Sequence, residues 1–422
     1  MPLSRRTFLA GSAAAFGFKN ETLDRMAALP FAPNDAEDEE FWMRIRGEFN
    51  IDPNLTSFNH AGLSPSPRTV LETIASEWKR ANVAPSFMIW RKQDYELDTV
   101  RKQLAEIVGC KTEQLALTMN ATYGLQTAIL GVPMSAGDEI LATEHEYSRA
   151  LTAMDQRGRR DGVVAVVLPL KAPPENQEEV AKQILAAVTD KTKLILLSQM
   201  TFLAGTKMPI RLVANALKGR DIPILVDGAH GIGLLPDQFS EQGGDIYTAC
   251  LHKWMMCPIG TGVFVATQPW IRQMWPLHPA EDNLNDSITK FEQIGSRPAA
   301  PFLAIKDALA FHNLIGRERK AARLEALRNR LAEKVLNLSG VHHFGSLDTN
   351  LGQVLLTVGF DKAPAAELAG WLLTKHRIHV TTVLRTEISG IRISPHIFTT
   401  LAEIDQLAGI LADVAKNGFK SI

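Results

Sequence analysis

One lysine of the sequence lies in unusually apolar company, in the stretch CLHKWMMCPIG at residues 250–260. Lysine is rarely buried unless something compensates its charge. Burial beside Trp254 and Met255 would lower the pKa of Lys253 and leave its amine a better nucleophile near neutral pH. The stretch therefore predicts a lysine that attacks a carbonyl carbon. The alternative is a lysine that extends from an apolar strand into solvent.

A carboxylate follows a second apolar run, in the segment VDGAH at residues 226–230. The small residues after Asp227 allow a ligand to come close. An aspartate so placed either caps a helix or pairs with a cation in a dry pocket. Together with Lys253 it predicts a pyridoxal phosphate site. The lysine would form a Schiff base, and Asp227 would keep the pyridine nitrogen protonated so that the ring accepts electrons.

Hydrophobic periodicity predicts the elements that position these two residues. Between about residues 110 and 270, short β-branched runs end at polar loops and alternate with helix-period segments, as in an α/β domain with a mainly parallel sheet. Ligands of such sheets bind beyond the carboxyl ends of the strands, where Asp227 and Lys253 lie. We expect seven strands, at residues 114–118, 139–143, 163–168, 193–198, 223–226, 245–249 and 262–266.

A second, smaller α/β domain is expected at the C-terminus. A long helical stretch at 299–336, broken by Gly316, would lead into it. There we expect strands at 353–358, 378–384 and 390–394, and helices at 364–375 and 400–415. Further helices are predicted at 67–80, 95–108, 178–188 and 212–217. The expected organisation is a leader at 1–32, an N-terminal arm at 33–66, a large domain at 67–315 and a small domain at 316–422.

The overall charge of the chain bears on whether it binds nucleic acid or membranes. With 45 basic and 46 acidic residues among 422, the formal net charge is −1. This gives no electrostatic reason to expect binding to nucleic acid or to an anionic membrane. The three cysteines, Cys110, Cys250 and Cys257, have no metal-ligand spacing, so we expect neither a disulfide framework nor a zinc site.

The first residues of the sequence resemble a targeting signal. Arg5 and Arg6 precede a stretch of alanine, glycine and serine that resembles a twin-arginine export signal. The stretch is too short to predict a membrane-spanning helix. Export to the periplasm is the expectation, and a disordered basic N-terminus on a cytoplasmic protein is the alternative.

Three segments together resemble the class V aminotransferase family of fold-type I pyridoxal phosphate enzymes. They are the DGAH segment at 227–230, the LHKW segment with PIGTG after it at 251–262, and GIRISPHIFTT at 390–400. The resemblance runs from about Ser57 to the C-terminus. Within the family, FNHAGLSP at 58–65 and RISPHIF at 392–398 resemble the isopenicillin N epimerase-like branch.

The resemblance implies residues that contact the cofactor ring. His230 would be a donor near the ring hydroxyl, and Thr201 would lie close to the same group. His145 would stack on the ring and assist proton transfer, because an imidazole titrates near neutral pH. Tyr147 is the alternative for the proton role.

The cofactor phosphate is expected at the start of a helix near residue 121, where free backbone N–H groups and the helix dipole favour an anion. Ala121 would contribute its backbone and Thr122 its hydroxyl. The resemblance adds His252 and Cys250, whose thiol is a weaker donor than a hydroxyl. It also implies that Ser296 reaches the cofactor of a neighbouring subunit, and so a homodimer with shared sites.

On the substrate side, the resemblance places Arg392 and Asn59, with the arginine fork on a substrate carboxylate. Desulfurases of the family carry a nucleophilic cysteine shortly before this arginine, but residues 380–391 contain none. Sulfur transfer is therefore disfavoured. We expect an amino-acid epimerase-like enzyme, with a β-lyase or C–S lyase as the second possibility and a transaminase as the third. A non-catalytic binding protein that keeps the fold is the alternative outside enzymes.

Overall fold

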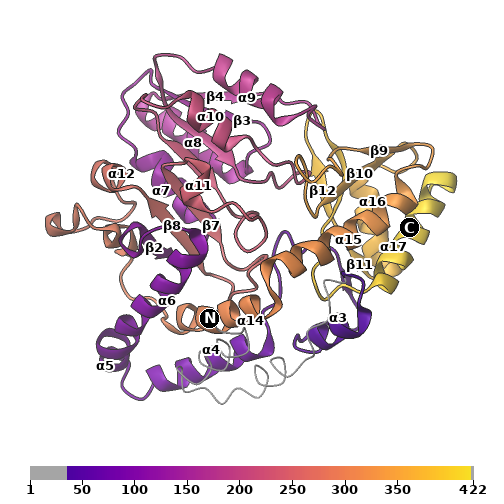
Figure 1. Ribbon diagram of the computed structural model, residues 1–422, viewed down its shortest axis with the longest axis horizontal. Helices are drawn as coiled ribbons and strands as arrows, with labels where there is room; N and C mark the ends of the chain where they lie inside the picture. The colour runs from indigo at the N-terminus through magenta and orange to yellow at the C-terminus, as the bar shows by residue number, and fades with distance from the viewer. Residues whose placement is uncertain (1–35, 420–422) are drawn as a thin grey trace, which may run out of the picture.

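The computed structural model describes residues 36–419, and a seven-stranded sheet forms the centre of its larger part (Figure 1). Six strands are parallel to one another, and β8 runs antiparallel to both of its neighbours. All seven predicted strands are present. Their order across the sheet is β2 (Leu115–Thr118), β8 (Gly262–Ala266), β7 (Ile246–Cys250), β6 (Ile224–Asp227), β5 (Thr192–Ser198), β3 (Glu139–Thr143) and β4 (Val164–Leu168).

Helices bury both faces of this sheet, because successive residues of a strand point to opposite faces. Ala116 packs on one face, with residues of α7 (Ala121–Gly131) and α8 (Ser148–Asp161). Leu115 and Leu117 pack on the other face, with residues of α6 (Asp94–Val108), α9 (Gln177–Ala186) and α10 (Ile210–Ala216). Helix α6 ends at Val108, and Gly109, with a positive φ of 76°, caps its C-terminus.

A smaller antiparallel sheet follows towards the C-terminus, in the order β12 (Thr381–Leu384), β13 (Ser389–Ile393), β10 (Leu356–Phe360) and β9 (Val341–His343). Its apolar core includes residues of α15 (Arg317–Val335), α16 (Ala365–His376) and α17 (Leu401–Asn417). Thr400 and Glu403 form a capping box at the start of α17. Strand β9 was not predicted, because its three residues are not fully buried and show no apolar alternation.

The predicted strand at 378–384 is in fact two strands in two sheets. Its first part, β11 (Ile378–His379), pairs in parallel with β1 (Thr56–Ser57), while β12 joins the small sheet. The pairing of β1 with β11 brings the N-terminal arm beside the C-terminal part of the chain. The arm also contains α3 (Glu39–Arg46), which was not predicted and whose Trp42 packs in a core with Trp254.

The predicted long helix at 299–336 consists of three helices, α13 (Ala300–Leu303), α14 (Ile305–Ile315) and α15. The break before α15 falls at Gly316, as predicted, and the φ of this glycine is 88°. Helix α13 packs against α4 (Arg68–Ala81) and α6. Two short helical turns, α5 (Pro85–Met88) and η1 (Ile89–Gln93), connect α4 to α6.

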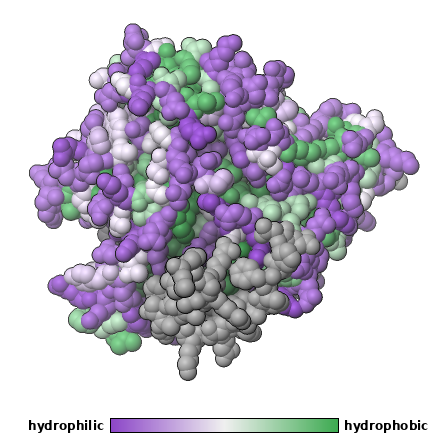
Figure 2. All heavy atoms as spheres, in the orientation of Figure 1, coloured by the Kyte–Doolittle hydropathy of each residue, from purple (hydrophilic) through white to green (hydrophobic). Residues whose placement is uncertain are grey.

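Most of the face shown in Figure 2 is hydrophilic, with hydrophobic residues gathered towards the middle of the view. Within residues 36–419, no helix combines the length and the apolar character needed to cross a membrane. The arginine pair of the expected export signal lies outside the residues that the structure describes.

Candidate active site

Lys253 follows the carboxyl end of β7 and carries its amine towards the turn after β6. Its Nζ lies 3.1 Å from Nε2 of His230. The residues behind it, Trp254 and Met255, are fully buried, so the apolar surroundings predicted from the sequence are present. This burial is the main cause that lowers the pKa of Lys253. The charge of Asp227 raises this pKa and the charge of Arg392 lowers it.

Asp227 is the last residue of β6 and is buried at the same edge of the sheet. Its Oδ1 accepts a hydrogen bond of 3.0 Å from the backbone N–H of Ala229. Burial raises the pKa of Asp227, whereas the Ala229 N–H and the charge of Lys253 lower it. Burial also places the pKa of His230 well below its ordinary value, so its Nε2 can accept a hydrogen bond from the Lys253 amine. The structure thus brings Lys253, Asp227 and His230 together from two neighbouring strand ends.

The start of α7 lies against the end of β7. Asn120 caps the helix by accepting a hydrogen bond of 2.9 Å from the backbone N–H of Tyr123. The N–H of Ala121 donates to Sγ of Cys250 at 3.3 Å, so these two predicted phosphate residues touch. Thr122 is half-buried in the first turn. His252 is buried, and its Nδ1 has no hydrogen-bond partner within residues 36–419.

His145 lies beyond the carboxyl end of β3 and is 2% exposed. Its Nε2 has no hydrogen-bond partner among the residues described, and burial lowers its pKa. Tyr147 precedes α8, and its ring meets that of Phe202 edge-on with centroids 5.8 Å apart. Thr201 is buried, and its hydroxyl accepts a hydrogen bond of 3.2 Å from the N–H of Thr206. That hydroxyl is thus engaged in a local turn, and its contact with the cofactor stays a prediction.

Arg392 extends from β13 into the space beside Phe202. Its Nη1 donates to the Phe202 carbonyl oxygen at 2.7 Å and its Nη2 donates to Oδ1 of Asn59 at 2.9 Å. Burial lowers the pKa of Arg392 to about 10, which leaves the guanidinium charged at neutral pH. The two hydrogen bonds fix the plane of the fork. The contact with Phe202 could not be predicted from the sequence, because it uses a backbone carbonyl, which every residue type carries.

Ser296 does not join this group of residues within the chain. It is exposed in the connection between η4 (Ile288–Glu292) and α13. Arg385, the exposed arginine near Arg392 in sequence, lies over the Phe202 ring at 6.0 Å from its centroid.

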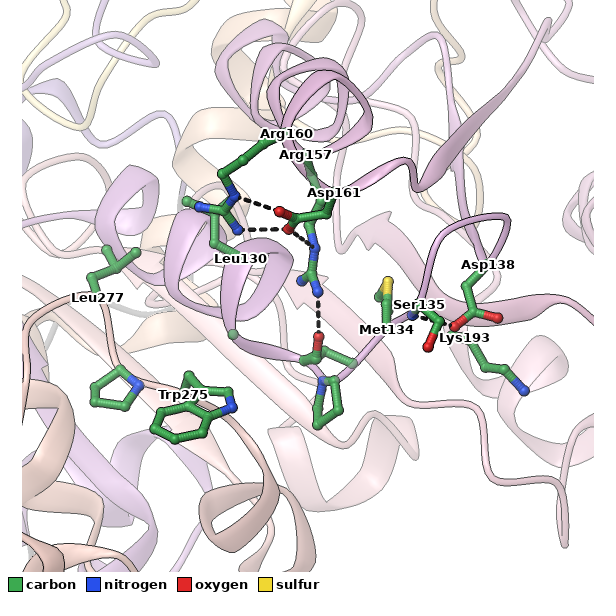
Figure 3. A pocket seen from close by; sticks show the side chains of 14 residues that line it. Leu130, Met134, Ser135, Asp138, Arg157, Arg160, Asp161, Lys193, Trp275 and Leu277 are labelled. Atoms are coloured by element: carbon green, nitrogen blue, oxygen red, sulfur yellow. Dashed lines mark hydrogen bonds and ion pairs between the residues drawn. The ribbon is translucent and has the colours of Figure 1, made fainter.

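A cavity of about 680 Å³ lies at the opposite edge of the large sheet (Figure 3). Asp138 and Lys193, at the amino ends of β3 and β5, line it together with Trp275 and the ion pair between Arg160 and Asp161. None of the residues predicted to contact cofactor or substrate contributes to its wall. The candidate site is therefore the cluster at the carboxyl ends of the strands.

The residues of that cluster fit pyridoxal phosphate. The buried ring nitrogens Nδ1 of His230, Nδ1 of His252 and Nε2 of His145 have no partner in the described part of the chain. Such orphaned polar atoms need a ligand or water to satisfy them. Lys253 offers an amine for the covalent bond, Asp227 a carboxylate for the pyridine nitrogen, and the start of α7 a dipole end for the phosphate.

The fold and this cluster define a fold-type I pyridoxal phosphate enzyme. The family model of class V aminotransferases matches residues 57–407, and the chain belongs to this family. Pyridoxal 5′-phosphate is therefore its cofactor.

Several characterised proteins are similar over most of the chain. Isopenicillin N epimerase of Amycolatopsis lactamdurans is 25% identical, and the match covers 89% of this chain and 99% of the epimerase. Hercynylcysteine sulfoxide lyase of Schizosaccharomyces pombe is 22% identical over 68% of this chain and 75% of the lyase. A solved structure of the cystine C–S lyase C-DES superimposes with a TM-score of 0.75 at 23% identity, covering 86% of this chain and 98% of that one. This structural likeness shows the fold.

Proposed function

We propose that this enzyme acts at the α-carbon of an amino acid, or of a small molecule that contains one, and that it is an epimerase or racemase. The nearly full-length similarity to isopenicillin N epimerase supports the reaction type. The observation that carries the proposal is that Lys253 and His145, two groups able to carry a proton, both lie beyond the carboxyl ends of strands of the same sheet. Each is held at the end of a different strand, and each has its pKa lowered by burial.

Epimerisation needs one group that removes the α-proton and another that returns a proton to the opposite face. When bound, pyridoxal phosphate supplies an electron sink that stabilises negative charge at the α-carbon. The Lys253 amine would hold or donate a proton at one face. Nε2 of His145 would do so at the other, with the Tyr147 hydroxyl as the alternative. The Arg392 fork, fixed by Asn59, would hold the substrate carboxylate.

A C–S lyase is the second candidate function, because hercynylcysteine sulfoxide lyase and a putative cysteine desulfhydrase of rice are also similar to this chain. Transamination is the third. A desulfurase mechanism has less support, because it needs a reactive thiol. Burial raises the pKa of Cys250, of Cys257 and of Cys110, the last to about 12. A protein that binds the cofactor without turnover is the remaining alternative.

The test is a panel of L-amino acids and cysteine conjugates, incubated with the enzyme in deuterated water and followed by NMR. We expect α-hydrogen exchange and loss of optical purity without release of keto acid, ammonia or sulfide. Stoichiometric pyruvate or ammonia from a β-substituted substrate would replace this proposal with a lyase. Keto acid formed only with an added amino acceptor would indicate a transaminase.

We propose further that the enzyme is a homodimer with shared active sites. Large apolar side chains are exposed on α4, α5, η1 and α6, including Trp78, Phe87, Trp90 and Tyr95, of which Tyr95 is 65% exposed. Ser296 lies in the connection that leads into α13, and α13 packs on α4 and α6. Sedimentation should give the mass of two chains, and Trp90→Glu should shift it towards one chain. A monomeric wild-type chain would refute the proposal.

The N-terminal arginine pair supports a proposal of export through the twin-arginine route, with residence in the periplasm. A reporter fused to residues 1–40 should leave the cytoplasm, and replacement of Arg5 and Arg6 by lysine should retain it there. A reporter that stays in the cytoplasm in both cases would favour a cytoplasmic enzyme.

A further inference from the structure

Glu146 is a buried carboxyl group beside the candidate site that has no assigned role. It directly follows His145 in the turn between β3 and α8, and it is 0% exposed. A buried acid without a cationic partner is unusual, because removing its charge from water is costly. Its neighbours therefore decide which protonation state it adopts.

Two hydroxyl groups hold the Glu146 carboxyl. Thr143, the last residue of β3, places its Oγ1 at 3.1 Å from Oε1, and Ser198, the last residue of β5, hydrogen bonds to Oε2. Neither oxygen has a lysine, arginine or histidine partner among the hydrogen bonds and ion pairs of residues 36–419. Hydroxyl groups can serve a neutral acid as well as an anion, since each both donates and accepts.

Asp227 lies on the neighbouring strand and makes the neutral form the favourable one. Ser198 and Asp227 are directly paired between β5 and β6, so their side chains lie on the same face of the sheet. The bond from Ser198 places Glu146 on that side too. Asp227 is the titratable group whose charge acts on Glu146. A second buried negative charge next to Asp227 would be repelled by it.

We propose that Glu146 is a positioning residue that works as a neutral carboxylic acid, tying the His145 turn to the strand pair that ends in Ser198 and Asp227. It thereby holds the imidazole in place and leaves the charge of Asp227 undisturbed by a neighbouring carboxylate. This inference rests on one part of the proposed function, which is that His145 and Asp227 contact the cofactor.

The pH dependence has a definite sign. Burial is the main cause that raises the pKa of Glu146 from 4.5 to about 8. The charge of Asp227 raises this pKa as well, whereas the hydrogen bonds from Ser198 and Thr143 lower it and offset part of the rise. Between these two values the folded chain binds more protons at this group than the unfolded chain does. The stabilisation is therefore fully present below 4.5 and is lost as the pH rises through about 8.

The test compares E146Q, which mimics the neutral acid, with E146A. At about pH 7 we expect E146Q to keep the absorbance of the bound cofactor, and E146A to alter the spectrum because the His145 turn is released. We also compare the melting temperatures of E146Q and wild type. The difference, E146Q minus wild type, should increase by a few degrees as the pH is raised from about 5 to 9, with or without cofactor. E144Q, which changes the adjacent half-buried acid, should follow the wild-type pH profile.

Two results would overturn the proposal. One is an E146Q variant that disturbs the bound-cofactor spectrum as much as E146A, which would mean that the anion is required. The other is a melting difference that does not depend on pH. If E146Q does not fold, infrared spectroscopy of the wild type decides the matter: a carboxylic acid carbonyl band should persist at neutral pH and vanish through about pH 8. Because the melting and infrared measurements need no turnover, they can fail independently of the proposed epimerase reaction.

Discussion

Replacing Arg392 by lysine tests how the enzyme would hold the substrate carboxylate. Arg392 is 4% exposed, and its guanidinium already makes two hydrogen bonds, to the Phe202 carbonyl and to Asn59. These bonds use one N–H on each terminal nitrogen and leave the remaining N–H groups in a fixed plane for a carboxylate. A lysine ammonium keeps the charge but loses the planar fork.

The expected loss of substrate affinity follows from the hydrogen bond to the carboxylate that a lysine ammonium cannot replace. Losing one of two charge-assisted hydrogen bonds to a carboxylate costs about 1.5–3 kcal/mol. Since about 1.4 kcal/mol corresponds to a factor of ten, substrate binding should weaken roughly 10- to 100-fold. Asn59→Ala leaves the guanidinium in place but removes the acceptor that orients it. Its effect should be smaller, about 1 kcal/mol or roughly fivefold.

The assay is α-hydrogen exchange in deuterated water as a function of the concentration of the amino acid that the panel identifies. We expect the half-saturating concentration to rise in Arg392→Lys, while the rate at saturation changes much less, because the contact is made before and during the reaction alike. Arg385→Lys is the matched control, since this exposed arginine lies over the Phe202 ring and the substitution keeps its charge. A rate at saturation that falls as much as the affinity, or an affinity that does not change, would refute the assignment of Arg392.

Three further predictions concern the cofactor and its proton relay. Lys253→Ala should give a folded protein without the near-visible absorbance that borohydride bleaches; a variant that keeps both absorbance and turnover would refute the role of Lys253. Asp227→Asn should retain cofactor but slow α-hydrogen exchange. The decrease in rate should correspond to a few kcal/mol, as expected for the loss of a charge-assisted contact. An unchanged exchange rate would reject the role of Asp227. Because burial lowers the pKa of His145 below its ordinary value of 6.5, the exchange rate should hold down to lower pH than that value. A His145→Gln variant that retains the same acidic limb would instead favour Tyr147.

Much of the large sheet was predictable because its strands are short and, apart from the edge strand β4, largely buried on both faces. Each therefore appears in the sequence as an apolar run that ends at polar residues. Strand β9 and the division between β11 and β12 were not predictable. Their positions depend on pairing with distant strands, β10 for the first and β1 for the second.

The sequence by itself determined the chemistry of the site, because the residue types that react are fixed in the chain and lie at or just beyond the ends of recognisable strands. Lys253 and Asp227 could be found in this way. Tertiary structure alone decided what surrounds them. The fork of Arg392 is held by a carbonyl 190 residues away and an amide 333 residues away, and Glu146 is held next to Asp227 through Ser198. Burial and neighbouring charge, which exist only in the folded chain, set the pKa values that make these groups useful.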